Sequence, residues 1–108
     1  MTLGQLSPRA LRIRERLFTR LVKRGGWDVG KTPLLNVLAH LCDEHLRLRE
    51  EVRASDLAQA VTLAEKAVEA RELARLTLAE LGLIDRSRIR AAILNEQGDD
   101  ALIAELAD

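Results

Sequence analysis

Residues 32–83 read TPLLNVLAHLCDEHLRLREEVRASDLAQAVTLAEKAVEARELARLTLAELGL, and they determine the fold that we expect. The first half carries an apolar stripe that is interrupted only by a histidine: Leu34, Leu38, Leu41, His45, Leu48 and Val52. The second half carries a stripe that is interrupted only by an arginine: Leu57, Ala60, Ala64, Ala67, Arg71, Ala74, Leu78 and Leu81. Steps of three and four residues keep side chains on one face of a helix. The stretch therefore predicts two long helices that fold back on each other as an antiparallel hairpin.

Both predicted helices carry signals for where they begin or end. Thr32 is a candidate N-cap with Pro33 at the first helical position, Ser55 is a second candidate N-cap, and Gly82 stands where a C-terminal cap is expected. Each helix would be about 30 to 40 Å long at ~1.5 Å of rise per residue, too long for one hairpin to cover its own stripes. We therefore expect the hairpin to contact other copies of the chain. The residues predicted at this interface are Leu34, Leu38, Leu41, His45, Leu48, Val52, Leu57, Ala64, Arg71 and Leu78.

The composition favours one all-α domain that spans residues 1–108. The chain has a formal net charge of +0 with 47% hydrophobic and 31% charged residues, which suits a folded domain. Ala, Leu, Arg and Glu dominate, the only aromatic residues are Trp27 and Phe18, and no stretch alternates as a strand does. We expect a basic helix and a glycine-rich loop (1–31), the oligomerising hairpin (32–83), and a short C-terminal helix with an acidic tail (84–108), assembled as a helical oligomer.

The sequence carries no signal for a membrane or an oxidising compartment. The single cysteine, Cys42, excludes an intramolecular disulfide. No apolar run is long enough to span a membrane, and the N-terminus lacks the apolar core of a secretion signal. We therefore expect a cytoplasmic protein without a membrane partner.

Charge is strongly segregated along the chain. Residues 1–31 contain eight basic and two acidic residues, whereas residues 95–108 contain five acidic residues and no basic one. Such asymmetry favours partners of opposite charge for the two ends, although a solvated charged face is the simpler explanation of each run.

The N-terminal helix is predicted to begin at Ser7 and Pro8 and to run to about Arg24. Most of its basic residues fall on one arc, and its apolar residues Leu17, Phe18, Leu21 and Val22 lie on the other side. Such a helix could bind nucleic acid, lie on a membrane surface, or present a solvated face. We favour phosphate contacts with double-stranded DNA. The predicted DNA-binding residues are Arg9, Arg12, Arg16, Arg20, Lys23 and Arg24, with Arg86, Arg88 and Arg90 as a secondary cluster.

Residues 25–32 read GGWDVGKT, which matches the pattern of the phosphate-binding loop of nucleotide hydrolases. That loop follows a β-strand, and here a basic helix precedes it. Pro33 also removes an amide from the first turn of the next helix. We therefore expect no nucleotide binding, and predict an interhelical loop with Trp27 packed on the bundle.

The cluster His40, Cys42, Asp43, Glu44 and His45 contains residue types that ligate metals. The two histidines are five residues apart, which places them about 140° apart around a helix, so they cannot easily share one ion. No second group completes a site, and no nucleophile, base and orienting acid stand in a recognisable arrangement. We expect no metal, no cofactor and no enzymatic activity.

The stretch 81–88, LGLIDRSR, resembles the end of the second long helix in small terminase subunits of tailed bacteriophages. Leu81, Gly82 and Leu83 match its leucine-glycine-leucine turn, and Ser87 and Arg88 match the cap and arginine that follow. Leu41-Cys42 is similar to a pair that such proteins often carry in the first long helix, and the resemblance covers about residues 17–92. The connection at residues 53–56 is shorter than the glycine-rich crossover common in that family.

The resemblance implies a function in viral genome packaging. Small terminase subunits are generally not enzymes; they assemble into rings through their long helices, recognise viral DNA and present it to the large subunit, which is the motor and nuclease. It implies a homo-oligomer in the cytoplasm of an infected bacterial host cell, with the acidic tail facing solvent or the motor. Two alternatives stay open: a helical oligomerisation or adaptor protein without a nucleic-acid role, and a small dimeric DNA-binding regulator.

Overall fold

A computed structural model describes residues 3–83 and 96–107, and every regular element in these two ranges is helical. The elements are η1 (Leu3–Gln5), α1 (Pro8–Lys23), η2 (Val29–Lys31), α2 (Thr32–Ala54), α3 (Leu57–Glu80) and α5 (Glu96–Ala107). The predicted all-α fold is confirmed for these residues. None of these helices is long and apolar enough to cross a membrane.

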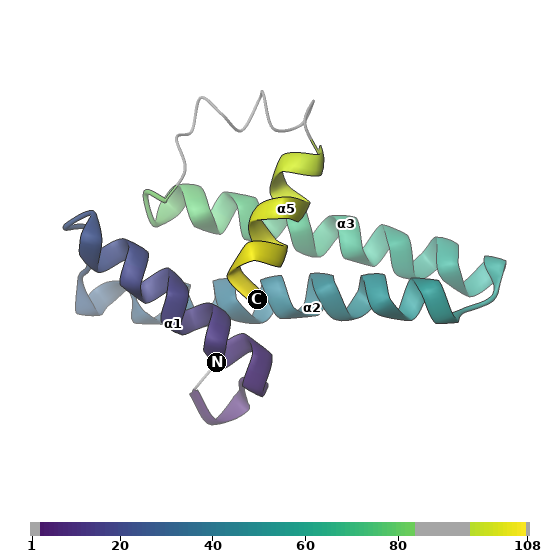
Figure 1. Cartoon of the computed structure of the whole chain (residues 1–108), viewed down its shortest axis with the longest axis horizontal. Helices are drawn as coiled ribbons and strands as arrows, with labels where there is room; N and C mark the ends of the chain where they lie inside the picture. The colour runs from purple at the N-terminus through teal and green to yellow at the C-terminus, as the bar shows by residue number, and fades with distance from the viewer. Residues whose placement is uncertain (1–2, 84–95, 108) are drawn as a thin grey trace.

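Helices α2 and α3 run antiparallel as the long hairpin, and α1 and α5 lie against one part of it (Figure 1). At the turn, the carboxylate of Asp56 accepts the Gln59 N–H at 2.9 Å and caps the start of α3. The prediction that Ser55 is this N-cap was wrong by one residue, because Ser55 ends α2 and its hydroxyl donates to the Glu51 carbonyl. The charged side chain next to it thus satisfies the free amides of the helix start.

Other helix ends follow the sequence signals more closely. Ser7 caps α1 by accepting the Ala10 N–H at 3.1 Å, as predicted. Gly82 adopts a positive φ of 74°, and Leu83 N–H donates back to the Leu78 carbonyl at 2.9 Å, which ends the second long helix as predicted. Thr32 was predicted as the N-cap of α2, which was wrong: it is already helical, because η2 runs directly into the helix.

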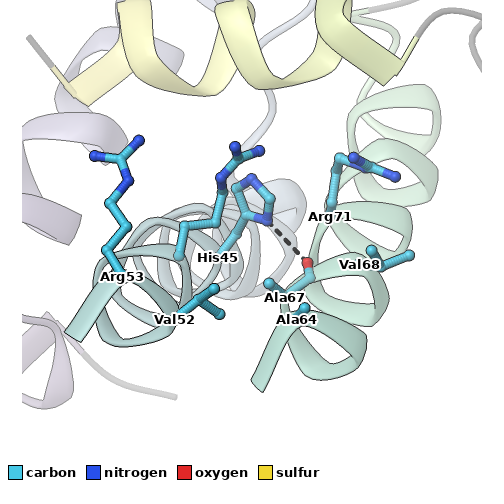
Figure 2. Close-up of a pocket in the computed structure, with 8 residues that line it drawn as sticks. His45, Val52, Arg53, Ala64, Ala67, Val68 and Arg71 are labelled. Atoms are coloured by element: carbon cyan, nitrogen blue, oxygen red, sulfur yellow. Dashed lines mark hydrogen bonds between the residues drawn. The ribbon is translucent and has the colours of Figure 1, made fainter. Parts of the chain in front are cut away.

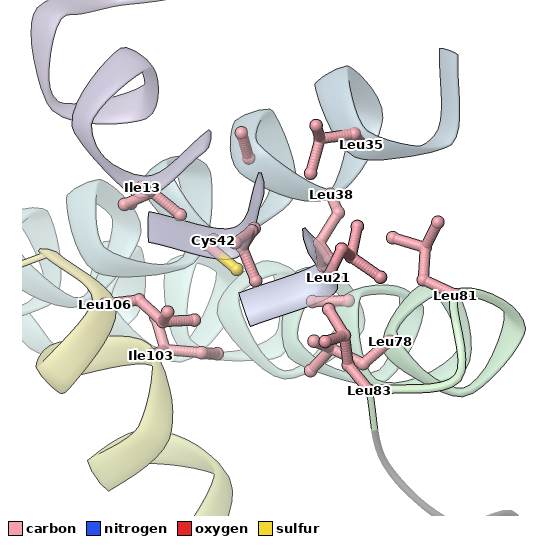
Figure 3. Close-up of a cluster of buried hydrophobic side chains, with 13 residues drawn as sticks. Ile13, Leu21, Leu35, Leu38, Cys42, Leu78, Leu81, Leu83, Ile103 and Leu106 are labelled. Carbon is pink, nitrogen blue, oxygen red and sulfur yellow. The ribbon is translucent and has the colours of Figure 1, made fainter. Parts of the chain in front are cut away.

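The core forms where α1, α2, the end of α3 and α5 meet (Figure 3). The side chains of Ile103 and Leu106 are only 2% and 1% exposed, so α5 completes this core. Burying each such side chain stabilises the fold by about 1.5–3 kcal/mol. The segment that was expected to be a solvent-facing acidic tail is therefore a helix whose apolar side is packed inside. The core residues are Ile13, Leu17, Leu21, Leu35, Leu38, Ala39, Cys42, Ala74, Leu78, Leu81, Leu83, Ile103 and Leu106.

Burial divides the hairpin into two parts. We define the covered half as residues 32–48 and 67–83, which contains all the buried residues of the hairpin. We define the distal half as residues 49–66, in which no residue is buried. The turn end of the hairpin projects past α1 and α5 (Figure 1).

Candidate nucleic-acid interface

Four predicted DNA-binding residues lie along one side of α1: Arg12, Arg16, Arg20 and Lys23. Steps of four and three residues bring them to the same side of the helix. They border an open hollow of about 600 Å³, which we call the α1 groove. From the first to the last of them, α1 rises about 16 Å. The residues that line the groove are Arg12, Glu15, Arg16, Thr19, Arg20, Lys23 and Glu105.

Arg9 was predicted with this set, but it does not line the groove and instead holds α1 on α2. Its Nε lies 2.6 Å from Asp43 Oδ1 and its Nη1 lies 2.6 Å from Glu50 Oε1. Burial by itself would lower the pKa of Arg9, but the hydrogen bonds to these two carboxylates raise that pKa above its ordinary value. Ser7 donates its hydroxyl to the other oxygen of Asp43 at 2.8 Å. Arg9 is thus engaged in a polar clamp within the chain.

Arg24 is also engaged away from the groove. Its Nη1 donates to the carbonyls of Gly82 and Leu83 at 3.0 and 3.2 Å, where α3 has just ended. These carbonyls follow the helix and lack helical partners, so a cation satisfies them well. Arg24 therefore ties the end of α1 to the end of the hairpin.

Two groove residues contact α5. Arg16 Nη1 donates to the carbonyls of Glu105 and Leu106 at 3.0 and 3.1 Å. Arg20 Nη2 lies 3.1 Å from Glu105 Oε1. Arg12 and Lys23 are exposed, and neither makes an ion pair or side-chain hydrogen bond with any described residue. The secondary cluster of Arg86, Arg88 and Arg90 lies outside the described residues.

The predicted interface residues fall into three groups by burial. Five of them are packed inside the chain: Leu38, His45, Leu48, Arg71 and Leu78. Leu41 and Val52 are partly buried, and the remaining three are exposed: Leu34, Leu57 and Ala64. Fewer of these residues are therefore exposed to a second copy than the stripes suggest.

His45, Val52, Ala64 and Arg71, all predicted at the interface, line one hollow of about 210 Å³ (Figure 2). The ring Nδ1 of His45 lies 2.8 Å from the Ala67 carbonyl oxygen, and because a carbonyl can only accept, Nδ1 carries the hydrogen. The bond joins the two arms of the hairpin. The other side chains that line the hollow are Arg49, Arg53, Ala67 and Val68.

The two histidines that were considered as metal ligands contact different partners. His40 Nε2 lies 3.4 Å from a Glu44 carboxylate oxygen, while His45 turns to the facing helix. Burial, with a smaller contribution from Asp43, raises the pKa of Cys42 to about 12, so its thiol stays protonated near neutral pH. Within the two described ranges, no group of three or more His, Cys, Asp or Glu residues could hold a metal ion.

The GGWDVGKT loop uses its polar groups internally. The Gly30 N–H donates to its neighbour Asp28 at 3.0 Å, and the Lys31 ammonium donates to the Gly26 carbonyl. These are the kinds of group that a phosphate-binding loop offers to a nucleotide. Trp27 packs edge-on against Phe18 with ring centroids 4.8 Å apart, which confirms its predicted place on the bundle.

Sequence reasoning missed Glu105, which enters the groove from the far end of the chain. The signal was present: Leu102, Ile103 and Leu106 form an apolar side within the acidic segment, at the spacing of an amphipathic helix. It also missed Asp43 as the partner of Arg9, because nothing in the spacing reveals which helix will lie beside α1.

Comparisons with known protein families, with curated proteins and with solved structures find no match for this chain. The α1 groove and the exposed distal half are therefore the structural features that bear on function.

Proposed function

We propose that this protein is a small terminase subunit of a tailed bacteriophage. In this proposal it forms a homo-oligomeric ring, binds viral double-stranded DNA, presents that DNA to the large terminase subunit, and is not itself an enzyme. The observation that carries the proposal is the α1 groove, in which four basic side chains lie along about 16 Å of one helix.

The groove suits the phosphates of a duplex better than bases. Arginine and lysine neutralise phosphates and release counterions, which supplies affinity without sequence readout. Binding of single strands usually relies on aromatic platforms, whereas Trp27 and Phe18 are partly buried against each other and the core. Arg12 and Lys23 are exposed and are the side chains best placed to meet a phosphate.

The distal half supports the oligomeric part of the proposal. Leu57 is 83% exposed and Val61 is 54% exposed, on the part of α3 that neither α1 nor α5 covers. Exposed apolar patches on small proteins commonly mark contact surfaces. A ring needs a heterologous contact, in which this surface meets a different surface of the next copy.

The distal half alone would also suit a helical adaptor without a nucleic-acid role. The two functions differ in what the α1 groove does: an adaptor needs no affinity for phosphates, whereas a terminase subunit does. DNA binding, measured together with molar mass, separates them.

The test is a salt titration of duplex binding for the full chain, with molar mass measured by light scattering. We expect a closed oligomer larger than a dimer, and an affinity that falls steeply as salt rises. The double variant Arg12→Ala/Lys23→Ala should keep that mass, bind all duplex sequences more weakly, and lose about two units of salt slope per protomer that contacts DNA.

The matched control lowers the charge by the same two units elsewhere: Arg47→Glu, at an exposed position of α2 in the covered half. It should bind DNA as the unaltered protein does. Absence of duplex binding at low salt, or an equal loss in the double variant and in Arg47→Glu, would overturn the proposed DNA function. A dimer would point to the regulator instead.

A further inference from the structure

We infer that Glu105 of α5 occupies a phosphate position in the α1 groove, and that this carboxylate sets how tightly the groove binds duplex DNA. The inference rests on the proposed function and deepens it. In it, Glu105, which is distant in sequence from α1, competes with the DNA backbone for Arg20.

The ion pair between Glu105 and Arg20 has the geometry of a displaceable contact. The atoms Oε1 and Nη2 are 3.1 Å apart, and the two side chains are 69% and 40% exposed. Exposed pairs of this kind contribute little to stability, because water screens both charges. A carboxylate and a phosphate offer similar anionic oxygens to a guanidinium, so a duplex phosphate can replace the carboxylate.

Other contacts hold α5 in place independently of this pair. Arg16 donates to the Glu105 and Leu106 carbonyls, which belong to the last turn of α5 and have no helical partner. A cation at that end also complements the helix dipole. Ile103 and Leu106 are fully buried. Removing the carboxylate of Glu105 should therefore free Arg20 without releasing the helix.

The charge balance of the groove explains how Glu105 affects DNA binding. Four basic and two acidic side chains line it, and Glu105 is the acidic one that forms a pair with a basic side chain of the groove. While that pair exists, Arg20 must give up the carboxylate before it can neutralise a phosphate, so fewer counterions leave the DNA at Arg20. The protein then gains less affinity from Arg20 than from Arg12 or Lys23.

The experiment compares Glu105→Gln with Glu72→Gln in the full chain, by salt titration of duplex binding with helicity and molar mass checked. Both changes remove one negative charge, but Glu72 is exposed on α3 and does not line the groove. We expect Glu105→Gln to raise affinity about threefold to tenfold near 0.1 M salt, and to steepen the salt slope by about one unit. Glu72→Gln should change neither.

A second pair of variants tests whether the gain in affinity for duplex DNA requires Arg20. In an Arg20→Ala background, Glu105→Gln should no longer steepen the salt slope, because no guanidinium is freed. The inference is overturned if Glu105→Gln and Glu72→Gln have equal effects, or if the gain persists without Arg20 while Arg12→Ala/Lys23→Ala still weakens binding. If the unaltered protein binds no duplex at low salt, both the inference and the proposed function fail.

Discussion

The covered half and the distal half of the hairpin belong to the same two helices, yet they differ sharply in burial. Leu78 in the covered half is 5% exposed, whereas Leu57 on the same predicted stripe of α3 is 83% exposed. The periodic pattern is equally clear in both halves. The comparison teaches that an apolar stripe predicts a helix face, while burial depends on which other elements reach that face.

Helix length explains the difference. Helix α2 has 23 residues and α1 has 16, so α2 is about 34 Å long and α1 only about 24 Å. Helix α5, with 12 residues, crosses the hairpin instead of following it (Figure 1). Neither covering helix extends to the turn at Ser55, and the distal half therefore stays outside the core.

The largest effect is expected in the covered half. Leu78→Asp places a charge among apolar side chains without a partner, at a cost of several kcal/mol, comparable to the ~5–15 kcal/mol stability of a small domain. We expect loss of the cooperative unfolding transition, measured by circular dichroism in urea. A transition at the original urea midpoint would show that this part of α3 is not core.

The same type of change in the distal half should act on assembly and not on folding. Val61→Asp adds a charge to a side chain that is 54% exposed, so helicity should stay the same while molar mass falls by light scattering. Leu73→Asp, at a side chain of α3 in the covered half that is 52% exposed, serves as the control and should retain the oligomer. If both variants keep the original mass, the distal half is not the contact between copies.

A smaller effect is expected where the two halves meet. His45→Ala removes the bond to the Ala67 carbonyl and part of the packing between the arms, so the free energy of unfolding should drop by about 1–3 kcal/mol. His40→Ala breaks only a half-exposed contact with Glu44 and should cost much less. Urea titrations of both variants measure the difference in the free energy of unfolding. Equal losses would contradict a stabilising role for the hydrogen bond between His45 and Ala67.

The effect that is smallest at neutral pH is that of Cys42, which appears only at high pH. The folded state raises the pKa of Cys42 from 9.0 to about 12, so the unfolded chain releases the thiol proton first as pH rises. Stability should therefore be unaffected by this group below pH 9 and should decline between pH 9 and about 12. Cys42→Ala should lack this part of the decline, and at pH 8 the native thiol should resist alkylation until the protein unfolds.

Much of the helical framework could be predicted from local patterns. Ser7 marks a helix start because its side chain accepts a hydrogen bond from an exposed amide. Gly82 marks a helix end because a glycine readily adopts the positive φ at which the chain turns back to the last carbonyls. The stripes predicted both arms of the hairpin. Thr32 and Ser55 were wrong as N-caps, because a neighbouring residue takes that position in each case. Lys31 precedes the first residue of α2, and Asp56 caps α3.

The sequence by itself determined the helices, their approximate ends and the segregation of charge, because these depend on residues a few positions apart. Only the tertiary structure decided that Arg9 pairs with Asp43, that Glu105 lies in the α1 groove, and that α5 completes the core. The hydrogen bonds that Arg9 makes with Asp43 and that α1 makes with α5 join residues between 34 and 90 positions apart. Their free energy exists only after the helices have packed, so no local spacing could reveal them.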